Sequence, residues 1–195
     1  MDGTRLAAAI REGRILDVAN RLSVHDGEAI LIPAGTVHAL GPGLLLYEIQ
    51  QASDTTYRIY DWDRTQSTGR RLHLQESAEV ALPVGPTETR HPEIHAETGS
   101  APAIACDYFD LDLVRVSPAG GPLADDTSGR RFHILTVIEG GAEVRREGER
   151  IALGRFETAL VAGSAGPYEV RAVDGPASLL RAAVPDREGL TSASA

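Results

Sequence analysis

The sequence predicts an all-β fold preceded by one short helix. Runs rich in Ile, Leu, Val and Tyr recur from residue 24 to 60 and again from 108 to 185, and turn signals with Gly, Pro or Asp separate them. Helical periodicity occurs only near the start of the chain. Many short strands at regular spacing with few helices are typical of a β-sandwich or barrel.

The elements follow in chain order. Thr4 can cap a helix over residues 5–22, in which Gly13 is a weak point. The segments "GLLLYEIQQ" and "TYRIYDWDR" are predicted strands of the first half, and residues 82–103, with four prolines, are a predicted connection. Five strands are predicted in the second half: "YFDLDLVRVS", "FHILTVIEGGAEVRRE", "ETALVAG", "YEVRAV" and "ASLLRAAVP".

Composition narrows the function classes. The chain of 195 residues has 28 acidic against 19 basic residues, a net charge of −9, so nucleic acid and acidic membrane surfaces are not expected partners. Every basic residue is Arg, which excludes Schiff-base chemistry and lysine general bases. A lone cysteine forms no intrachain disulfide, and no signal peptide or membrane span is evident, so we expect a cytoplasmic protein.

One motif carries chemistry. Gly27, Pro33, Gly35 and His38 are spaced as G-x5-P-x-G-x2-H, which resembles the second sequence motif of the cupin superfamily. In physical terms Gly27 forms the turn before a predicted strand, and Pro33 and Gly35 form a sharp turn after it. His38 would then lie at the barrel mouth, where an imidazole can bind a divalent metal. Pro42 stands where the motif usually closes with Asn, so the exit loop differs.

The segment from residue 32 to 64, "IPAGTVHALGPGLLLYEIQQASDTTYRIYDWDR", resembles the core of type I mannose-6-phosphate isomerases in their short bacterial form. The likeness covers most of residues 4–185 and implies a bicupin of two jelly-roll barrels. Residues 1–73 would be the C-terminal part of the catalytic barrel, whose N-terminal part is lacking. Residues 74–187 would be a second, metal-free cupin-like barrel, and 188–195 a disordered tail.

The resemblance also implies a zinc ion, with His38 as one metal ligand. The family's other ligands come from a Q-x-H-P strand and a K-x-E-x-W strand, and neither pattern occurs in the first 26 residues. A catalytic zinc needs about three protein ligands, so we expect an incomplete metal site. In the second half His133 has no partner histidine, consistent with the metal-free barrel.

The implied reaction is the zinc-dependent interconversion of mannose 6-phosphate and fructose 6-phosphate, in which a proton moves between C1 and C2 through an enediolate. Arg58 matches the family's active-site arginine, and its permanent charge suits a developing anion or a phosphate. Glu48, Gln50 and Asp54 are candidates for the substrate pocket.

Other interpretations stay open. His38 could be a chance buried histidine, Arg58 could form a structural ion pair with Glu48, Asp54 or Asp61, and Asp54 could be a turn residue. The chain could instead be a noncatalytic sugar-phosphate-binding or scaffold cupin. It could also be one half of a split enzyme, completed by a homodimer or a partner chain that supplies strands, so the sequence leaves open whether this chain is itself an enzyme.

Overall fold

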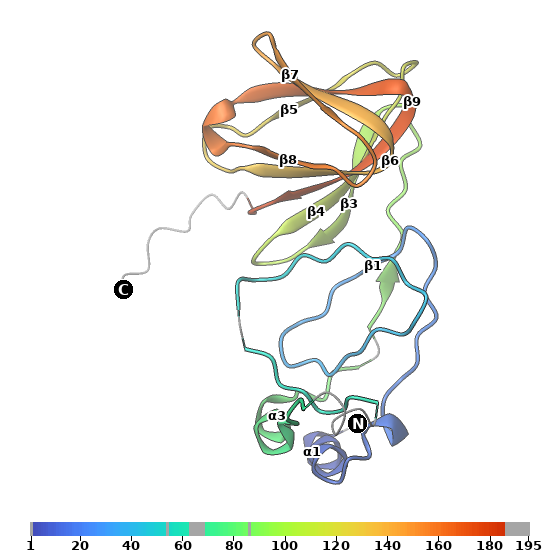
Figure 1. The fold of residues 1–195 in the computed structure, drawn as a ribbon, viewed down its shortest axis with the longest axis vertical. Coiled ribbons are helices and arrows are strands. Elements are labelled where there is room, and N and C mark those ends of the chain that lie inside the picture. The colour runs from blue at the N-terminus through green and yellow to red at the C-terminus, as the bar shows by residue number, and fades with distance from the viewer. Residues whose placement is uncertain (1, 54, 63–68, 86, 186–195) are drawn as a thin grey trace. The chain divides into compact units, whose positions relative to one another are not determined.

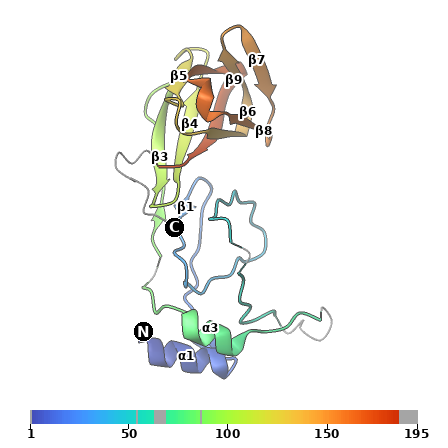
Figure 2. The same cartoon turned by 90° about the vertical axis from the view of Figure 1, so that its left-hand side faces the viewer.

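The structure is a computed structural model that describes residues 2–53, 55–62, 69–85 and 87–185 (Figure 1, Figure 2). The chain divides into two compact units, of which unit 1 comprises residues 1–25 and 30–89 and unit 2 comprises residues 26–29 and 90–195. The predicted tail, residues 188–195, lies outside the described residues. The identification of residues 1–73 and 74–187 as two barrels stays a prediction.

Unit 2 is built from a seven-stranded antiparallel sheet that curls around a common interior (Figure 1). Its strands are β3 (Gly99–Ala105), β4 (Asp110–Val116), β5 (Leu123–Asp126), β6 (His133–Arg146), β7 (Glu149–Leu153), β8 (Thr158–Val161) and β9 (Pro167–Ala183). The strand order is β3-β4-β9-β6-β7, with β5 paired to β9 and β8 paired to β6. The predicted all-β class with a short N-terminal helix is confirmed.

The interior of unit 2 is filled by alternate residues of its strands. Leu135 and Val137 on β6, Leu179 on β9 and Val114 and Val116 on β4 are each at most 1% exposed and belong to one apolar cluster. The period-2 alternation that predicted these strands therefore also selects the buried face. Burial of this apolar area is the main stabilising contribution to the unit.

Strands β6 and β9 are long because glycine lets them bend without ending. The two strands predicted between residues 168 and 185 form the single strand β9 of 17 residues, so that division was wrong. The register between β6 and β9 shifts around Gly140, whose φ is +72°. A Cβ atom on Gly140 would lie 2.4 Å from the carbonyl oxygen of Pro176, so only glycine allows this close approach.

Sequence reasoning missed three strands of the seven-stranded sheet, β3, β5 and β7. The connection predicted over residues 82–103 is wrong at its end, because β3 begins at Gly99. This strand consists mostly of small residues, and its pairing with β4 is irregular between Pro102 and Ile104, so it carries little of the apolar pattern expected of a strand.

The described residues of unit 1 include two short helices that pack on each other, α1 (Gly3–Arg11) and α3 (Leu74–Val80). The side chain of Asp2, rather than the predicted Thr4, caps α1 by accepting a hydrogen bond from the backbone N–H of Arg5 at 2.8 Å. The helix ends earlier than predicted because Gly13 has a φ of +68°, and a 3₁₀ turn, Ile15–Asp17, follows it. The missed helix α3 supplies the apolar face on which α1 packs.

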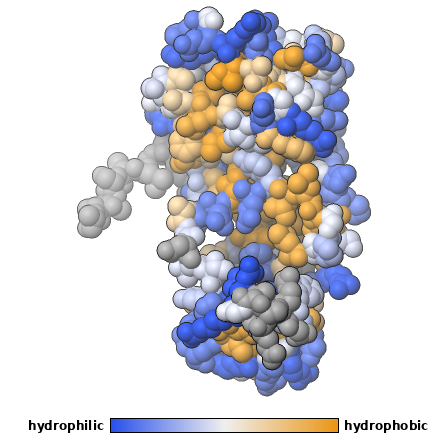
Figure 3. Space-filling view, in the orientation of Figure 1, coloured by the Kyte–Doolittle hydropathy of each residue, from blue (hydrophilic) through white to orange (hydrophobic). Residues whose placement is uncertain are grey.

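The strands predicted in the first half are largely wrong. Among the described residues up to 62, only β1 (Ala29–Ile30) is a strand, and it pairs with β2 (Thr89–Arg90). "GLLLYEIQQ" forms no ladder, and Leu45 is 80% exposed. A strand exists only through hydrogen bonds to a neighbouring strand, and the described part of the chain offers these segments none. Figure 3 shows apolar side chains at the surface of this unit.

Candidate functional site

His38 lies on an exposed corner that the sequence shapes as predicted. The backbone N–H of Thr36 bonds the carbonyl of Pro33 at 3.1 Å, and Gly35 has a φ of +82°. The carbonyl of Gly35 accepts a hydrogen bond from the N–H of Leu82 at 2.9 Å, which ties the corner to the segment just after α3. The turn that precedes His38 is therefore closed by its own hydrogen bond and held to a distant segment at Gly35.

The ring of His38 has a defined orientation. Its Nδ1 lies 3.0 Å from the carbonyl oxygen of Thr36. Because a carbonyl only accepts, Nδ1 carries the proton, and in the neutral ring Nε2 keeps its lone pair. His38 is exposed, so this nitrogen can act as a ligand or as a hydrogen-bond acceptor.

Arg58 is held through its backbone by a residue that sequence reasoning missed. The N–H of Arg58 donates to Nδ1 of His73 at 3.0 Å, and the N–H of His73 donates to the carbonyl of Arg58 at 2.8 Å. The ring of Tyr57 lies 5.9 Å from that of His73. These contacts fix a half-buried Arg58 beside the start of α3. No local pattern could predict a pairing across fifteen positions.

The structure gives no defined contacts among the described residues for the candidate residues of the substrate pocket. Glu48 and Gln50 are exposed, and Asp54 lies outside the described residues. Within the part of the chain that the structure describes, no group of three His, Cys, Asp or Glu side chains could hold a metal ion. His38 alone does not fit a zinc site, which takes about three protein ligands. The assignments of these residues stay predictions.

A second polar cluster lies inside unit 2, where the sequence predicted only a metal-free barrel. Fully buried His133 on β6 has its Nδ1 2.7 Å from the hydroxyl of Tyr168 on β9. That hydroxyl donates to Asp125 on β5 at 2.8 Å, and Arg181 on β9 bonds both Asp125 and Asp112 on β4. Four strands thus bring five polar side chains together.

The cluster fixes the protonation of its members. Since the Tyr168 hydroxyl donates to Asp125, its oxygen accepts from His133, which therefore carries its proton on Nδ1. Burial lowers the pKa of His133, which favours the neutral ring. Burial alone would raise the pKa of Asp125, but hydrogen bonds and charge from Arg181, together with the Tyr168 hydroxyl, hold it below its ordinary value. Burial, and then the charge of Asp125, raise the pKa of Tyr168.

Comparison with solved structures finds partial similarities, each covering about half of this chain. A double-stranded β-helix protein from Klebsiella pneumoniae matches with a TM-score of 0.42 and 17% identity, covering 50% of this chain and 84% of that one. A cupin-2 domain of a transcriptional regulator from Enterobacter cloacae matches with a TM-score of 0.41 and 18% identity, covering 47% of this chain and all of that one. No protein-family model matches the chain.

Curated sequences give the more specific likeness. The chain is 36% identical over 140 residues to mannose-6-phosphate isomerase ManA of Bacillus subtilis (strain 168), covering 69% of this chain and 43% of that protein. It is 45% identical over 62 residues to the mannose-6-phosphate isomerase of Streptococcus mutans, covering 31% of this chain and 20% of that protein. The resemblance to mannose-6-phosphate isomerases is confirmed, and the chain spans less than half the length of these relatives.

Membrane insertion was not expected from the sequence. Among the described residues, none of the helices has the length and apolar character needed to cross a bilayer.

Proposed function

We propose that this chain takes part in the isomerisation of mannose 6-phosphate and fructose 6-phosphate. The observation that carries the proposal is the 36% identity over 140 residues to a mannose-6-phosphate isomerase. The reaction moves one proton between C1 and C2 of the sugar, through an enediolate whose negative charge needs a cation beside it. Arg58 is the cation proposed for this task, because its guanidinium keeps its charge throughout.

The proposed role of His38 is to hold a divalent metal, zinc in the related enzymes, which when bound would polarise the sugar oxygens. The supporting feature is its exposed ring, whose Nε2 keeps a lone pair while Nδ1 is tied to Thr36. Because His38 by itself does not make a zinc site, the proposal requires further ligands from polypeptide other than the described residues.

A homodimer or a partner chain that adds strands to unit 1 is the proposed source of those ligands. Unit 1 exposes large apolar side chains, among them Leu44, Leu45 and Leu46, which are 47%, 80% and 46% exposed. These three residues are consecutive in a segment that pairs with no strand among the described residues. Exposed apolar segments without a pairing partner are typical of surfaces to which another chain binds.

The second candidate function is sugar-phosphate binding without catalysis. It is favoured by the finding that the described residues hold no three-ligand group for a metal. In this case mannose 6-phosphate should bind equally well in the presence of a chelator, since no metal ion takes part.

The test is a coupled isomerase assay on the full chain with added zinc. We expect Arg58→Ala to reduce turnover by about 10²-fold or more, the scale for losing one group that stabilises a transition-state anion. Arg14→Ala, which removes an exposed arginine of unit 1 from an ion pair with Asp17, is the matched control and should keep full turnover.

The outcomes separate the two candidates. Turnover that survives Arg58→Ala would overturn the role of Arg58. A folded chain that shows no turnover, yet binds mannose 6-phosphate in the presence of a chelator, would replace the isomerase with the binding protein.

A further inference from the structure

The backbone of Arg58 is bonded on both sides to one residue of unit 1, His73. The N–H of Arg58 donates to Nδ1 of the His73 ring at 3.0 Å, and the backbone N–H of His73 donates to the carbonyl of Arg58 at 2.8 Å. Both hydrogen-bonding groups of the Arg58 backbone are thus satisfied by His73. This pair of bonds fixes the point from which the long arginine side chain leaves the chain.

The ring of His73 is used for this contact and not for the helix that it precedes. His73 is the N-cap residue of α3, yet its side chain makes no capping hydrogen bond to that helix. Because a backbone N–H can only donate, Nδ1 accepts, and the neutral ring that makes this bond carries its proton on Nε2. The ring also lies beside that of Tyr57, with 5.9 Å between the ring centroids.

The apolar cluster of unit 1 supports the same pair. Ile59 and Leu74, the residues that follow Arg58 and His73 in the chain, both pack against the buried cluster of Leu6, Ile10 and Ile15. A shift of either hydrogen-bonded residue would therefore disturb packing on α1. Arg58 itself is half-buried, so its guanidinium stays accessible to a ligand while its backbone is held.

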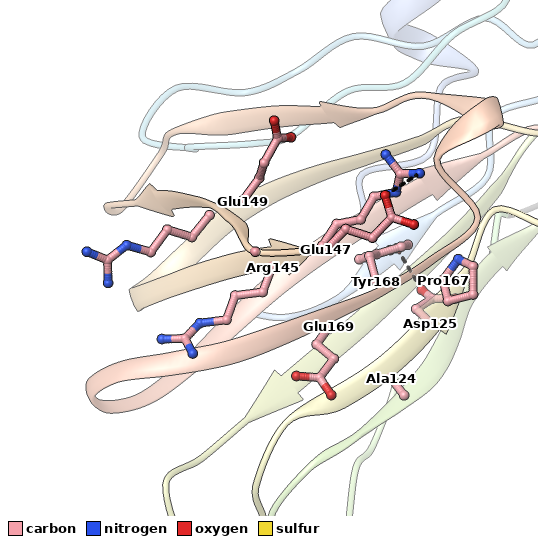
Figure 4. A pocket seen from close by; sticks show the side chains of 11 residues that line it. Ala124, Asp125, Arg145, Glu147, Glu149, Pro167, Tyr168 and Glu169 are labelled. Carbon is pink, nitrogen blue, oxygen red and sulfur yellow. Dashed lines mark hydrogen bonds and ion pairs between the residues drawn. The ribbon is translucent and has the colours of Figure 1, made fainter.

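The buried histidine of unit 2 has a different kind of partner. The ring of His133 donates to the hydroxyl of Tyr168, and Figure 4 shows the next bond, from that hydroxyl to Asp125. His133 thus belongs to a network of side chains. His73 instead bonds the main chain of the residue proposed to meet the substrate anion, and such support is what keeps a functional side chain in its productive geometry.

We propose that His73 is a positioning residue for the isomerisation, which holds the backbone of Arg58 so that the guanidinium lies beside the enediolate. The inference rests on the proposed function and adds to it a residue that acts through Arg58. A misplacement of about 1 Å at a reacting centre can cost about 10²-fold in rate, so loss of this bond should be visible in turnover.

The coupled isomerase assay on the full chain with added zinc tests the proposal with two substitutions. His73→Leu keeps a side chain of similar size but removes the acceptor. It should lower kcat about tenfold and change KM less than about twofold, because the enediolate charge develops only after the substrate has bound. His73→Asn keeps an acceptor, since its Oδ1 and the Nδ1 of histidine are both bonded to Cγ, and should retain kcat within about threefold.

Two further variants separate positioning from a general loss of structure. In a chain that already carries Arg58→Ala, His73→Leu should lower the remaining kcat by less than about twofold, because the effect of His73 passes through Arg58. His95→Leu changes a histidine of unit 2 whose side chain is 88% exposed, and this matched control should keep full turnover. Circular dichroism of each variant checks that the chain is folded.

Three results overturn the role of His73 and leave the proposed function in place, provided that the unsubstituted chain is active. They are an unchanged kcat in His73→Leu, equal losses in His73→Leu and His73→Asn, and a loss in His73→Leu that is equally large with and without Arg58→Ala.

A folded, unsubstituted chain without turnover overturns the proposed function instead. The same variants are then compared by calorimetric titration with mannose 6-phosphate. Binding that is about tenfold weaker in His73→Leu and restored in His73→Asn would keep His73 as the residue that positions Arg58, now for a bound phosphate. Equal binding by all variants, or binding by none, would overturn the role of His73 as well.

Discussion

Units 1 and 2 have similar strand-type sequence patterns but very different structures. In unit 2, β6 and β9 run for 14 and 17 residues, and Leu135 is 1% exposed. In unit 1 the segment around Leu45, predicted to be a strand, pairs with no described strand, and Leu45 is 80% exposed. The difference shows that an apolar pattern alone does not make a strand. A strand also needs a neighbouring strand that pairs with its backbone hydrogen-bonding groups and packs against its side chains.

The largest expected difference between the units concerns their ion pairs. Arg181→Met removes the cation shared by Asp112 and Asp125 inside unit 2, leaves two partly buried carboxylates unpaired, and should lower the free energy of unfolding by about 3–5 kcal/mol. Arg14→Met in unit 1 breaks a pair whose side chains are 66% and 55% exposed and should cost less than about 1 kcal/mol. Urea denaturation of both variants checks this, and equal losses would contradict it.

Apolar truncation gives the next largest contrast. Leu135→Ala opens a cavity in the core of unit 2 and should cost about 2–5 kcal/mol. Leu45→Ala removes an exposed side chain and should change stability by no more than about 0.5 kcal/mol in the isolated chain. The same urea experiment measures both. A large loss for Leu45→Ala would mean that another chain already covers this residue in solution.

Substitutions at two glycines of unit 2 distinguish the cost of a strained backbone from the cost of a steric clash. Gly140 and Gly148 both have positive φ, but only Gly140 has atoms where a Cβ would lie. Gly148→Ala should therefore cost about 1 kcal/mol for its backbone conformation alone. Gly140→Ala should cost about 1–3 kcal/mol more, because β6 and β9 must move apart. Equal thermal unfolding midpoints for the two variants would show that the strands move apart at Gly140 with little loss of stability.

The smallest expected effect is the dependence of unit 2 stability on pH. Because burial lowers the pKa of His133 in the folded chain, the unfolded chain takes up this proton first as the pH falls below about 6.5. Stability from this group is full above that pH and is lost below it, by at most about 1.4 kcal/mol per pH unit. His133→Gln should flatten the change in urea midpoint between pH 7.5 and 5.5, and an unchanged slope would contradict the assignment.

The sequence predicted the fold of unit 2 well where apolar alternation was strong. The segments predicted for β4, β6 and β8 contain those strands, and the buried faces follow the alternation. The prediction failed at β3, because small residues and Pro102 give little of the apolar pattern of a strand. It also failed in the middle of β9, where a turn-like sequence lies within one continuous strand whose pairing with β6 shifts in register. In unit 1 the local pattern was present, but the pairing partner it assumed was not among the described residues.

The candidate sites show the same limit. The corner that carries His38 was predictable, because Pro33 and Gly35 specify a turn by their own backbone preferences. The support of Arg58 by His73 was not, since it depends on a contact between distant segments. The polar cluster around His133 was missed for the same reason: its other members come from three further strands, and no spacing along the chain connects them.

The position of β9 along the chain has a consequence for biosynthesis. This strand pairs with β4, β5 and β6, and it is the last of the described strands to leave the ribosome. Between the completion of β4 at Val116 and the first residue of β9, Pro167, about 50 residues must be translated, which takes roughly 3–10 s at 5–20 residues per second. Throughout that interval β4 lacks this partner, and β6 lacks it from its own completion at Arg146, so the nascent chain presents open sheet edges to chaperones.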